Sequence, residues 1–310
     1  MSGSLCFMRL RTLTLLVSSA ALNRANAQLQ PADSVYDATV ARPSFSTNGG
    51  PVVAIDEAHS NFHTMRGRYR PFSELLRNDG FRVVANTAPF TPASLQSMTV
   101  LVIANALATP GRAAIDGTAF TFDEETALYE WVRRGGRLLL VADHEPMGSV
   151  AKRLAQRFGV DMSTGRTHDD PHSDWTSGSP TWLVFQRDSG ALIGEHPITA
   201  GRDNSERIQR VVTFTGQSLK GPPGSIALLS LASGAMDRIE GKDVPADGRA
   251  QGIAMQVGAG RLVVFGEAAM LTAQIGSSPG QPDLRFGFTW PRNDDRQLVL
   301  NTVRWLAGVY

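Results

Sequence analysis

Cysteine is nearly absent from this sequence. Its 310 residues include a single cysteine, Cys6, which lies in an N-terminal segment that we expect to be removed. A chain without thiols forms no disulfides, supplies no cysteine ligand to a metal and has no thiolate nucleophile. Any catalysis must therefore use oxygen and nitrogen side chains.

The sequence also lacks a large excess of either basic or acidic residues. The formal net charge is +1, with 30 basic and 29 acidic side chains. Residues 1–27 hold three arginines and no acid, which leaves 27 basic and 29 acidic side chains, about −2, in the rest of the chain. Nucleic acids and anionic membranes recruit basic surfaces. The charge therefore predicts neither of them as a partner.

The N-terminus has the pattern of a secretory signal peptide. Arg9 and Arg11 precede an apolar run over residues 13–22, and Ala25-Asn26-Ala27 supplies the small residues that signal peptidase requires. The run is shorter than the roughly 20 residues of a membrane-spanning helix, so we expect no membrane span. The sequence predicts a signal peptide over residues 1–27 and a secreted or periplasmic protein.

The remaining chain divides into a short leader and one domain. Residues 28–50 are rich in Pro, Ser, Thr, Asn and Gly without an apolar period, which predicts an extended leader. Residues 51–310 are close to the largest size that a single hydrophobic core usually reaches. We therefore expect one large domain there.

Short apolar runs alternate with helical patterns through the first half of this domain. Unbroken apolar runs are typical of parallel strands that are covered on both faces. They lie at residues 52–55, 100–104, 138–142 and 262–265. Amphipathic helical patterns lie at about residues 71–79, 121–134, 149–158 and 294–306. This alternation predicts a doubly wound α/β sheet, and Gly258-Ala259-Gly260 predicts an added C-terminal β-hairpin.

Acidic and imidazole side chains gather where predicted strands end. Asp56, Glu57, His59 and His63 follow the strand at 52–55, and Asp143 and His144 follow the strand at 138–142. A third cluster, with His168 and His172, lies in a loop of residues 168–174. Ligands of open α/β sheets bind outside the carboxyl ends of the strands. We therefore expect the first two clusters to face one cavity, which Glu267 could also enter.

Two functional interpretations and one structural interpretation fit these clusters. His59, Asp143 and His144, with His168 and His172, could hold a divalent metal such as zinc or iron that activates water. Without a metal, His59 or His144 could act as a base beside Asp56, Glu57 or Asp143. In the structural interpretation, Asp56 and Asp143 cap helices and the histidines bond to loop backbone.

Several stretches of the chain resemble one superfamily. They are residues 53–63, 131–146, 196–201, 260–271 and 295–306. They are similar to the class I glutamine amidotransferase-like superfamily, in particular its exported branch labelled DUF4350. That branch is related to the domain shared by gliding-motility and intraflagellar-transport proteins. The resemblance implies a flavodoxin-like three-layer αβα sandwich with a mostly parallel sheet.

The same resemblance reveals a departure from the amidotransferases. Those enzymes have a cysteine at the turn after the strand equivalent to 138–142, where this chain has Asp143-His144. Glutamine hydrolysis through a thioester is therefore excluded, whereas trehalose-utilisation-like members similarly carry a histidine near that turn. We expect an exported, metal-assisted hydrolase of a carbohydrate or cell-envelope compound. The alternative is a non-catalytic module that binds a glycan, another small molecule or a protein, either in the same cleft or on loops that bear Trp175, Trp182 and Trp290.

Overall fold

The structure of the chain is a computed structural model that describes residues 30–107, 117–277, 280 and 282–310. The predicted signal peptide, residues 1–27, lies outside the described residues. Among the helices that are described, none has the length and apolar character needed to cross a membrane.

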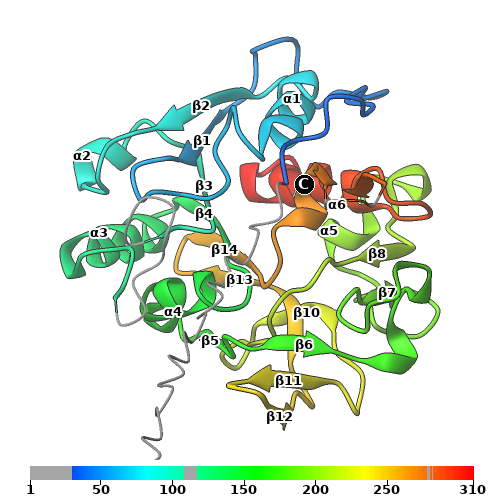
Figure 1. The fold of residues 1–310 in the computed structure, drawn as a ribbon. Coiled ribbons are helices and arrows are strands. Elements are labelled where there is room, and N and C mark those ends of the chain that lie inside the picture. The colour runs from blue at the N-terminus through cyan, green and yellow to red at the C-terminus, as the bar shows by residue number, and fades with distance from the viewer. Residues whose placement is uncertain (1–29, 108–116, 278–279, 281) are drawn as a thin grey trace, which may run out of the picture.

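A central sheet of nine strands organises the described part of the chain (Figure 1). Its strands are β1 (Val52–Asp56), β2 (Arg82–Asn86), β3 (Val100–Ala104), β4 (Arg137–Val141), β5 (Asp161–Met162), β9 (Leu219–Lys220), β10 (Ile226–Ser230), β13 (Ala250–Val257) and β14 (Gly260–Phe265). Their order is β2-β1-β3-β4-β14-β13-β9-β5, with β10 also paired to β13. The five strands from β2 to β14 are parallel. This order is that of the flavodoxin-like fold.

Helices cover both faces of this sheet. They are α1 (Arg70–Asn78), α2 (Pro92–Leu95), α3 (Phe122–Arg133), α4 (Met147–Arg157), α5 (Pro197–Ala200) and α6 (Asp295–Ala307). Successive strand residues point to opposite faces, so Val53 and Ile55 pack on the side of α1 and α6, whereas Ala54 packs on the side of α2, α3 and α4. The expected three-layer α/β sandwich is confirmed.

The expected C-terminal hairpin is also confirmed. Strand β13 pairs antiparallel with β14 through the turn at Gly258, and β14 then lies parallel to β4. The hairpin therefore joins the parallel half of the sheet to an antiparallel half. It also brings the end of β14 beside the end of β4.

The connections outside the central sheet contain several short elements. Small antiparallel sheets are formed by β6 (Arg166–His168), β11 (Met236–Ile239) and β12 (Lys242–Pro245), by β7 (Val184–Gln186) and β8 (Arg210–Val212), and by β15 (Ala273–Gly276) and β16 (Leu284–Gly287). Single 3-10 turns are η1 (Asp170–His172), η2 (Trp175–Ser177), η3 (Asn204–Glu206) and η4 (Ala269–Leu271). The elements η4, β15 and β16 follow the carboxyl end of β14 along the chain.

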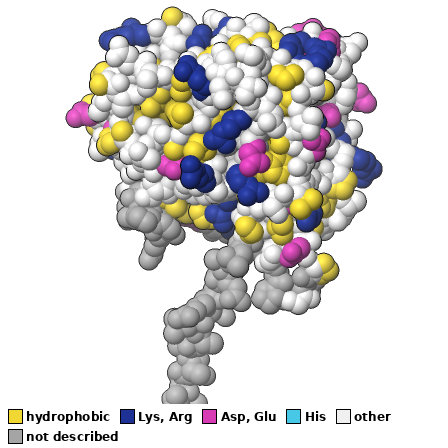
Figure 2. Space-filling model, turned by 90° about the horizontal axis from the view of Figure 1, so that it is seen from above, with side chains coloured by type: hydrophobic (Ala, Val, Ile, Leu, Met, Phe, Trp, Pro, Cys, Tyr) yellow, Lys and Arg dark blue, Asp and Glu magenta, His cyan; other side chains and the backbone are white. Residues whose placement is uncertain are grey.

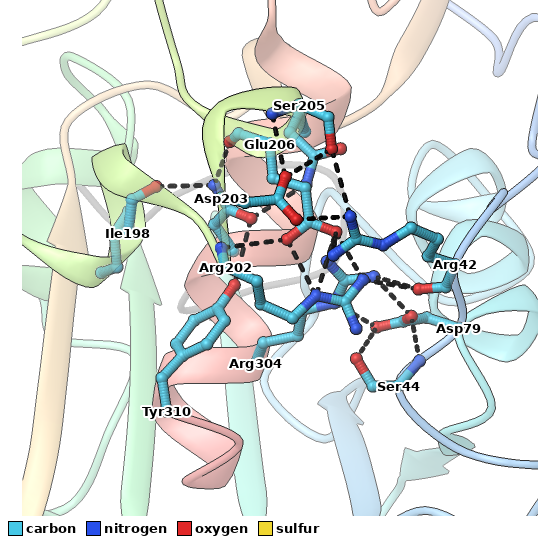
Figure 3. Close-up of polar contacts among 12 residues, drawn as sticks. Arg42, Ser44, Asp79, Ile198, Arg202, Asp203, Ser205, Glu206, Arg304 and Tyr310 are labelled. Atoms are coloured by element: carbon cyan, nitrogen blue, oxygen red, sulfur yellow. Dashed lines mark hydrogen bonds and ion pairs between the residues drawn. The ribbon is translucent and has the colours of Figure 1, made fainter.

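The leader packs on the domain along its described length. Ala32 forms a bridge with Gln274 of β15, and buried Asp33 pairs with Arg285. Further along, the Arg42 carbonyl oxygen and Ser44 join a polar network around Arg304 (Figure 3). The leader is thus tied to two separate parts of the domain.

The face of the molecule seen from above carries Lys and Arg side chains interspersed with hydrophobic and acidic ones (Figure 2).

Candidate functional site

A polar cavity of about 380 Å³ lies at the carboxyl ends of β4 and β14. We call it the central cavity. Its charged and polar lining includes Gln30, His63, Asp143, His144, Arg166, Thr215, Glu267 and Gln274. The carboxyl ends of parallel strands are the expected position for a ligand site in this fold.

Asp143 follows β4 directly and is fixed on three sides. Its Oδ1 accepts a hydrogen bond from the Ala268 backbone N–H at 2.7 Å. Its Oδ2 accepts one from Nδ2 of Asn105 at 2.6 Å, and its own N–H donates to Oδ1 of Asn105 at 2.9 Å. Asn105 follows β3 with a φ of 48°, in the left-handed region that asparagine tolerates. The reciprocal bonds therefore lock two neighbouring strand ends together.

Glu267 supplies a second carboxyl group from the end of β14. Its side chain is almost fully buried, and its two oxygens accept hydrogen bonds from the backbone N–H groups of Ala269 and Met270 at 2.7 and 2.8 Å. Burial and the nearby Asp143 carboxylate raise the pKa of Glu267.

Burial likewise raises the pKa of Asp143, against the lowering effect of Asn105, the Ala268 N–H and Arg68. Two carboxyl groups in one buried site are not readily ionised together, because burial and the charge of the first carboxylate both disfavour ionisation of the second. Such a pair can hold a proton near neutral pH, as acid–base catalysts do.

His63 lies beside this pair in its neutral form. The ring is buried, and burial together with Arg68 lowers the pKa of His63 to about 3. Nδ2 of Asn105 lies 3.2 Å from its Nδ1 and donates to it, so the neutral ring carries its proton on Nε2. The first histidine cluster reaches the cavity through His63.

His144 is half-buried in the cavity wall, as predicted. Its Nδ1 lies 2.6 Å from the Glu145 carbonyl oxygen, to which it donates, so Nε2 is left as an acceptor. Burial and Arg166 lower the pKa of His144, which keeps the ring neutral. A neutral imidazole with one free acceptor can take a proton from water or from a ligand.

His59 occupies a different environment. Its Nδ1 lies 2.8 Å from Oδ2 of Asp56 and its Nε2 lies 2.9 Å from Oε1 of Glu124. Its ring packs against Phe90 and Phe120. Burial lowers the pKa of His59, but the two carboxylates outweigh it, so the pKa is raised. His59 is not among the residues that line the central cavity, and its contacts are those of a buried ionic bridge.

The other predicted residues also have local partners. Oε1 of Glu57 accepts a hydrogen bond from the Met65 N–H, His168 pairs with Asp243 at 3.0 Å and His172 pairs with Asp169 at 3.0 Å. Within the described ranges, no three His, Cys, Asp or Glu side chains are grouped so that they could hold a metal ion. The predicted metal ligands are therefore divided among separate local contacts.

Aromatic side chains form the other wall of the central cavity. Phe62, Trp182, Phe214 and Phe286 are part of its lining. The Trp182 ring centroid lies 4.8 Å from that of Phe214, and Trp290 packs behind Trp182 at 4.9 Å. Pockets that bind small molecules combine such apolar walls with a few fixed polar groups.

The sequence interpretation did not include Asn105 or Gln274. Asn105 is the first polar residue after the apolar run at 100–104, the same signal that identified Asp143. Gln274, whose amide lies 3.4 Å from Nε2 of His63, has no such signal because it belongs to a short strand within an aperiodic segment.

The sequence matches no family model and no curated protein, but solved structures resemble the fold. The N-terminal domain of mmIFT52 has a TM-score of 0.59 at 13% identity, over 82% of this chain and 97% of that domain. A cytoplasmic protein from Salmonella typhimurium has a TM-score of 0.50 at 15% identity, over 83% and 98%. A ThuA-like protein from Bacteroides uniformis has a TM-score of 0.44 at 12% identity, over 88% and 95%.

The chain has the same fold as the N-terminal domain of mmIFT52. This neighbour agrees with the fold that the sequence resemblance implied. At these identities the likeness concerns the fold alone, because one fold supports many unrelated activities. Any activity has to be argued from the central cavity.

Proposed function

We propose that this protein is a hydrolase in which Asp143 and Glu267 act as the acid–base pair. The observation that carries the proposal is that two desolvated carboxyl groups, both with a raised pKa, stand at adjacent strand ends on one cavity. Glu267, whose ionisation Asp143 opposes, is the acid and protonates the leaving oxygen. Asp143 is the base and takes a proton from the attacking water. His144 offers Nε2 as a further acceptor for that water.

The lining of the central cavity supports a carbohydrate or a related cell-envelope compound as the substrate. Trp182 and Phe214 offer flat apolar surfaces, and Arg166, Thr215 and Gln274 offer hydrogen-bonding groups. A sugar ring has one apolar face and a rim of hydroxyl groups, which fits a cavity with both kinds of wall. From the N-terminal pattern we also propose that the protein is exported. From the stretches at residues 53–63, 131–146, 196–201, 260–271 and 295–306 we propose that it belongs to the DUF4350-type branch.

A non-catalytic binding module is the second candidate. The carboxylate oxygens of Asp143 and Glu267 all accept hydrogen bonds from Asn105 or from backbone N–H groups of residues 268–270. Such bonds are also what a structural support for the turn at η4 would make. In this alternative, the cavity holds a glycan without changing it.

Hydrolysis of a panel of 4-nitrophenyl glycosides and acetates separates the two candidates. We expect turnover of at least one compound, with kcat about 10²–10⁴-fold lower in Asp143→Asn and in Glu267→Gln. Asp243→Asn is the matched control, because this carboxylate pairs with His168 away from the central cavity, and it should keep the wild-type rate. Wild-type rates in both cavity variants would refute the acid–base role. Binding of a panel compound without turnover would favour the module.

The predicted metal can be tested on the same preparation. Metal-assisted hydrolysis predicts stoichiometric zinc or iron in the purified protein and loss of turnover on chelation. The acid–base pair proposed here predicts a rate that chelators leave unchanged. A chelator-sensitive rate, restored by added metal, would return the mechanism to His144 and Asp143 as ligands.

A further inference from the structure

A second concave surface includes Leu183 and Val184, the residues that follow Trp182, in its lining. It consists of a hollow of about 550 Å³ and a smaller one of about 140 Å³, which share His172, Val184 and Ser189 in their linings. We call it the Trp175 groove, because Trp175 lines the larger hollow. None of its lining residues lines the central cavity, so the two are separate.

Trp175 is exposed but held in place. Its side chain is 57% exposed, whereas the other four tryptophans are buried or half-buried. Its indole Nε1–H donates to the Asp170 carbonyl oxygen at 2.8 Å. The hydrogen bond fixes the ring against its own loop, so a ligand that stacks on it costs little side-chain entropy. An exposed, oriented tryptophan beside a groove is typical of a surface that receives a flat apolar partner.

The polar side chains on the floor of the groove are held in place by hydrogen bonds to one another, without a ligand. Asp174 is buried, and its Oδ2 accepts hydrogen bonds from Nη2 of Arg210 at 2.9 Å and from Nε1 of Trp290 at 3.1 Å. Asp174 Oδ1 accepts one from the Thr176 N–H at 3.1 Å. A floor fixed by a buried ion pair keeps its shape when a ligand binds.

The charges along the groove nearly balance one another. Asp174 pairs with Arg210, Asp188 and Arg292 add one charge of each sign to the lining, and Asp169 is hydrogen-bonded to the His172 ring. A surface of this kind does not select an anion or a cation. It offers a flat aromatic face and hydrogen-bonding side chains, which together match a neutral sugar ring.

We propose that the Trp175 groove binds a neutral oligosaccharide, with one sugar ring stacked on the Trp175 indole and its hydroxyl groups bonded along the floor. The groove binds its ligand without catalysing a reaction on it, and this binding does not depend on the acid–base pair. It would keep a chain of sugars on the surface of the protein, next to the segment from which Trp182 lines the central cavity.

Calorimetric titration with maltotetraose, cellotetraose, chitotetraose and mannotetraose tests this site on the intact protein. We expect at least one of the four to bind, with at least tenfold weaker affinity in Trp175→Ala and nearly wild-type affinity in Trp175→Phe, which keeps a flat ring. Phe122→Ala is the control for loss of an exposed aromatic side chain, since Phe122 is 63% exposed on α3, and it should bind as wild type does.

The double variant Asp143→Asn with Glu267→Gln separates this site from the central cavity. It should bind the oligosaccharide as tightly as the wild type. The proposal is overturned if none of the four probes binds, if Trp175→Ala binds as well as wild type, or if affinity is lost in the double variant and kept in Trp175→Ala. The last of these results would place oligosaccharide binding in the central cavity. The acid–base role itself is decided separately, by the turnover of the glycoside and acetate panel.

Discussion

Glu267 couples the stability of the protein to pH. Its pKa is raised on folding, so the native state holds a proton that the unfolded state releases above about pH 4.5, the ordinary glutamate value. The stabilisation is therefore complete below that pH and is lost as the pH rises toward the raised pKa. We expect the free energy of unfolding to fall by up to about 1.4 kcal/mol per pH unit in that window.

Replacing Glu267 by glutamine should flatten this dependence. Glutamine has no proton to lose, so the difference between wild type and Glu267→Gln should change with pH, in favour of the variant at the higher values. Urea unfolding from pH 5 to pH 9 measures it. The groups that contribute to the same titration are Asp143 and Asp295, which also oppose ionisation of this site. Parallel pH profiles for the two proteins would show that Glu267 does not carry the effect.

Residue by residue, the sequence predicted only part of the lining of the central cavity. The rule that polar residues follow buried strands found Asp143, His144 and Glu267, because a strand end is visible as the end of an apolar run. It favoured His59 over His63, whereas the cavity lining contains His63 and not His59. The chain after β1 runs through turns, with Ser60 at a φ of 52°, and a turn has no period that tells which side chain faces the cavity.

Among the elements, the contact between the β13–β14 hairpin and α3 depends on a glycine. A Cβ atom on Gly260 would lie 2.0 Å from the Val132 carbonyl oxygen and 2.3 Å from that of Gly136. Both are backbone atoms, so relief requires movement of α3 or of β14. We expect Gly260→Ala to destabilise the protein by about 3 kcal/mol, the upper end for overpacking.

Gly194→Ala is the control for this substitution. The space around Gly194 is open, with one side-chain atom at 3.8 Å, so the change should stay within about 0.5 kcal/mol, as is usual at surface positions. Denaturant unfolding of the two variants gives the comparison. Equal stability of both would mean that the hairpin does not lie as close to α3 as described here.

The length of an element decides whether the sequence predicts it. The parallel strands and α1, α3, α4 and α6 were found because each spans enough residues for an apolar run or a helical stripe. The strands of the segments at 161–181 and 272–293 have two to four residues each, which is too short for a period of two to stand out. Their pairing is set by distant partners, such as β11 for β6.

Across the whole molecule, Arg304 of α6 joins the leader to two other parts of the domain (Figure 3). Its guanidinium donates to both oxygens of Asp79 at the end of α1, at 2.7 and 2.8 Å. It also lies 3.1 Å from Glu206 of η3 and donates to the Arg42 carbonyl oxygen. Asp79 in turn accepts from the Ser44 N–H at 2.8 Å. The sequence could not predict this network, because its members are separated by up to 262 positions.

Arg304→Met should therefore loosen the leader as well as destabilise the domain. The variant leaves Asp79 buried without its cation, whereas Glu206 keeps Arg202. Losing one member of a buried ion pair costs about 3–5 kcal/mol. Unfolding by denaturant measures this loss, and hydrogen exchange should rise in residues 42–50. Because the penalty comes from the uncompensated Asp79 charge, adding Asp79→Asn to Arg304→Met should recover part of the stability. If the double variant were less stable than Arg304→Met by the full cost of Asp79→Asn alone, the two side chains would be acting independently and the leader would be held by other contacts.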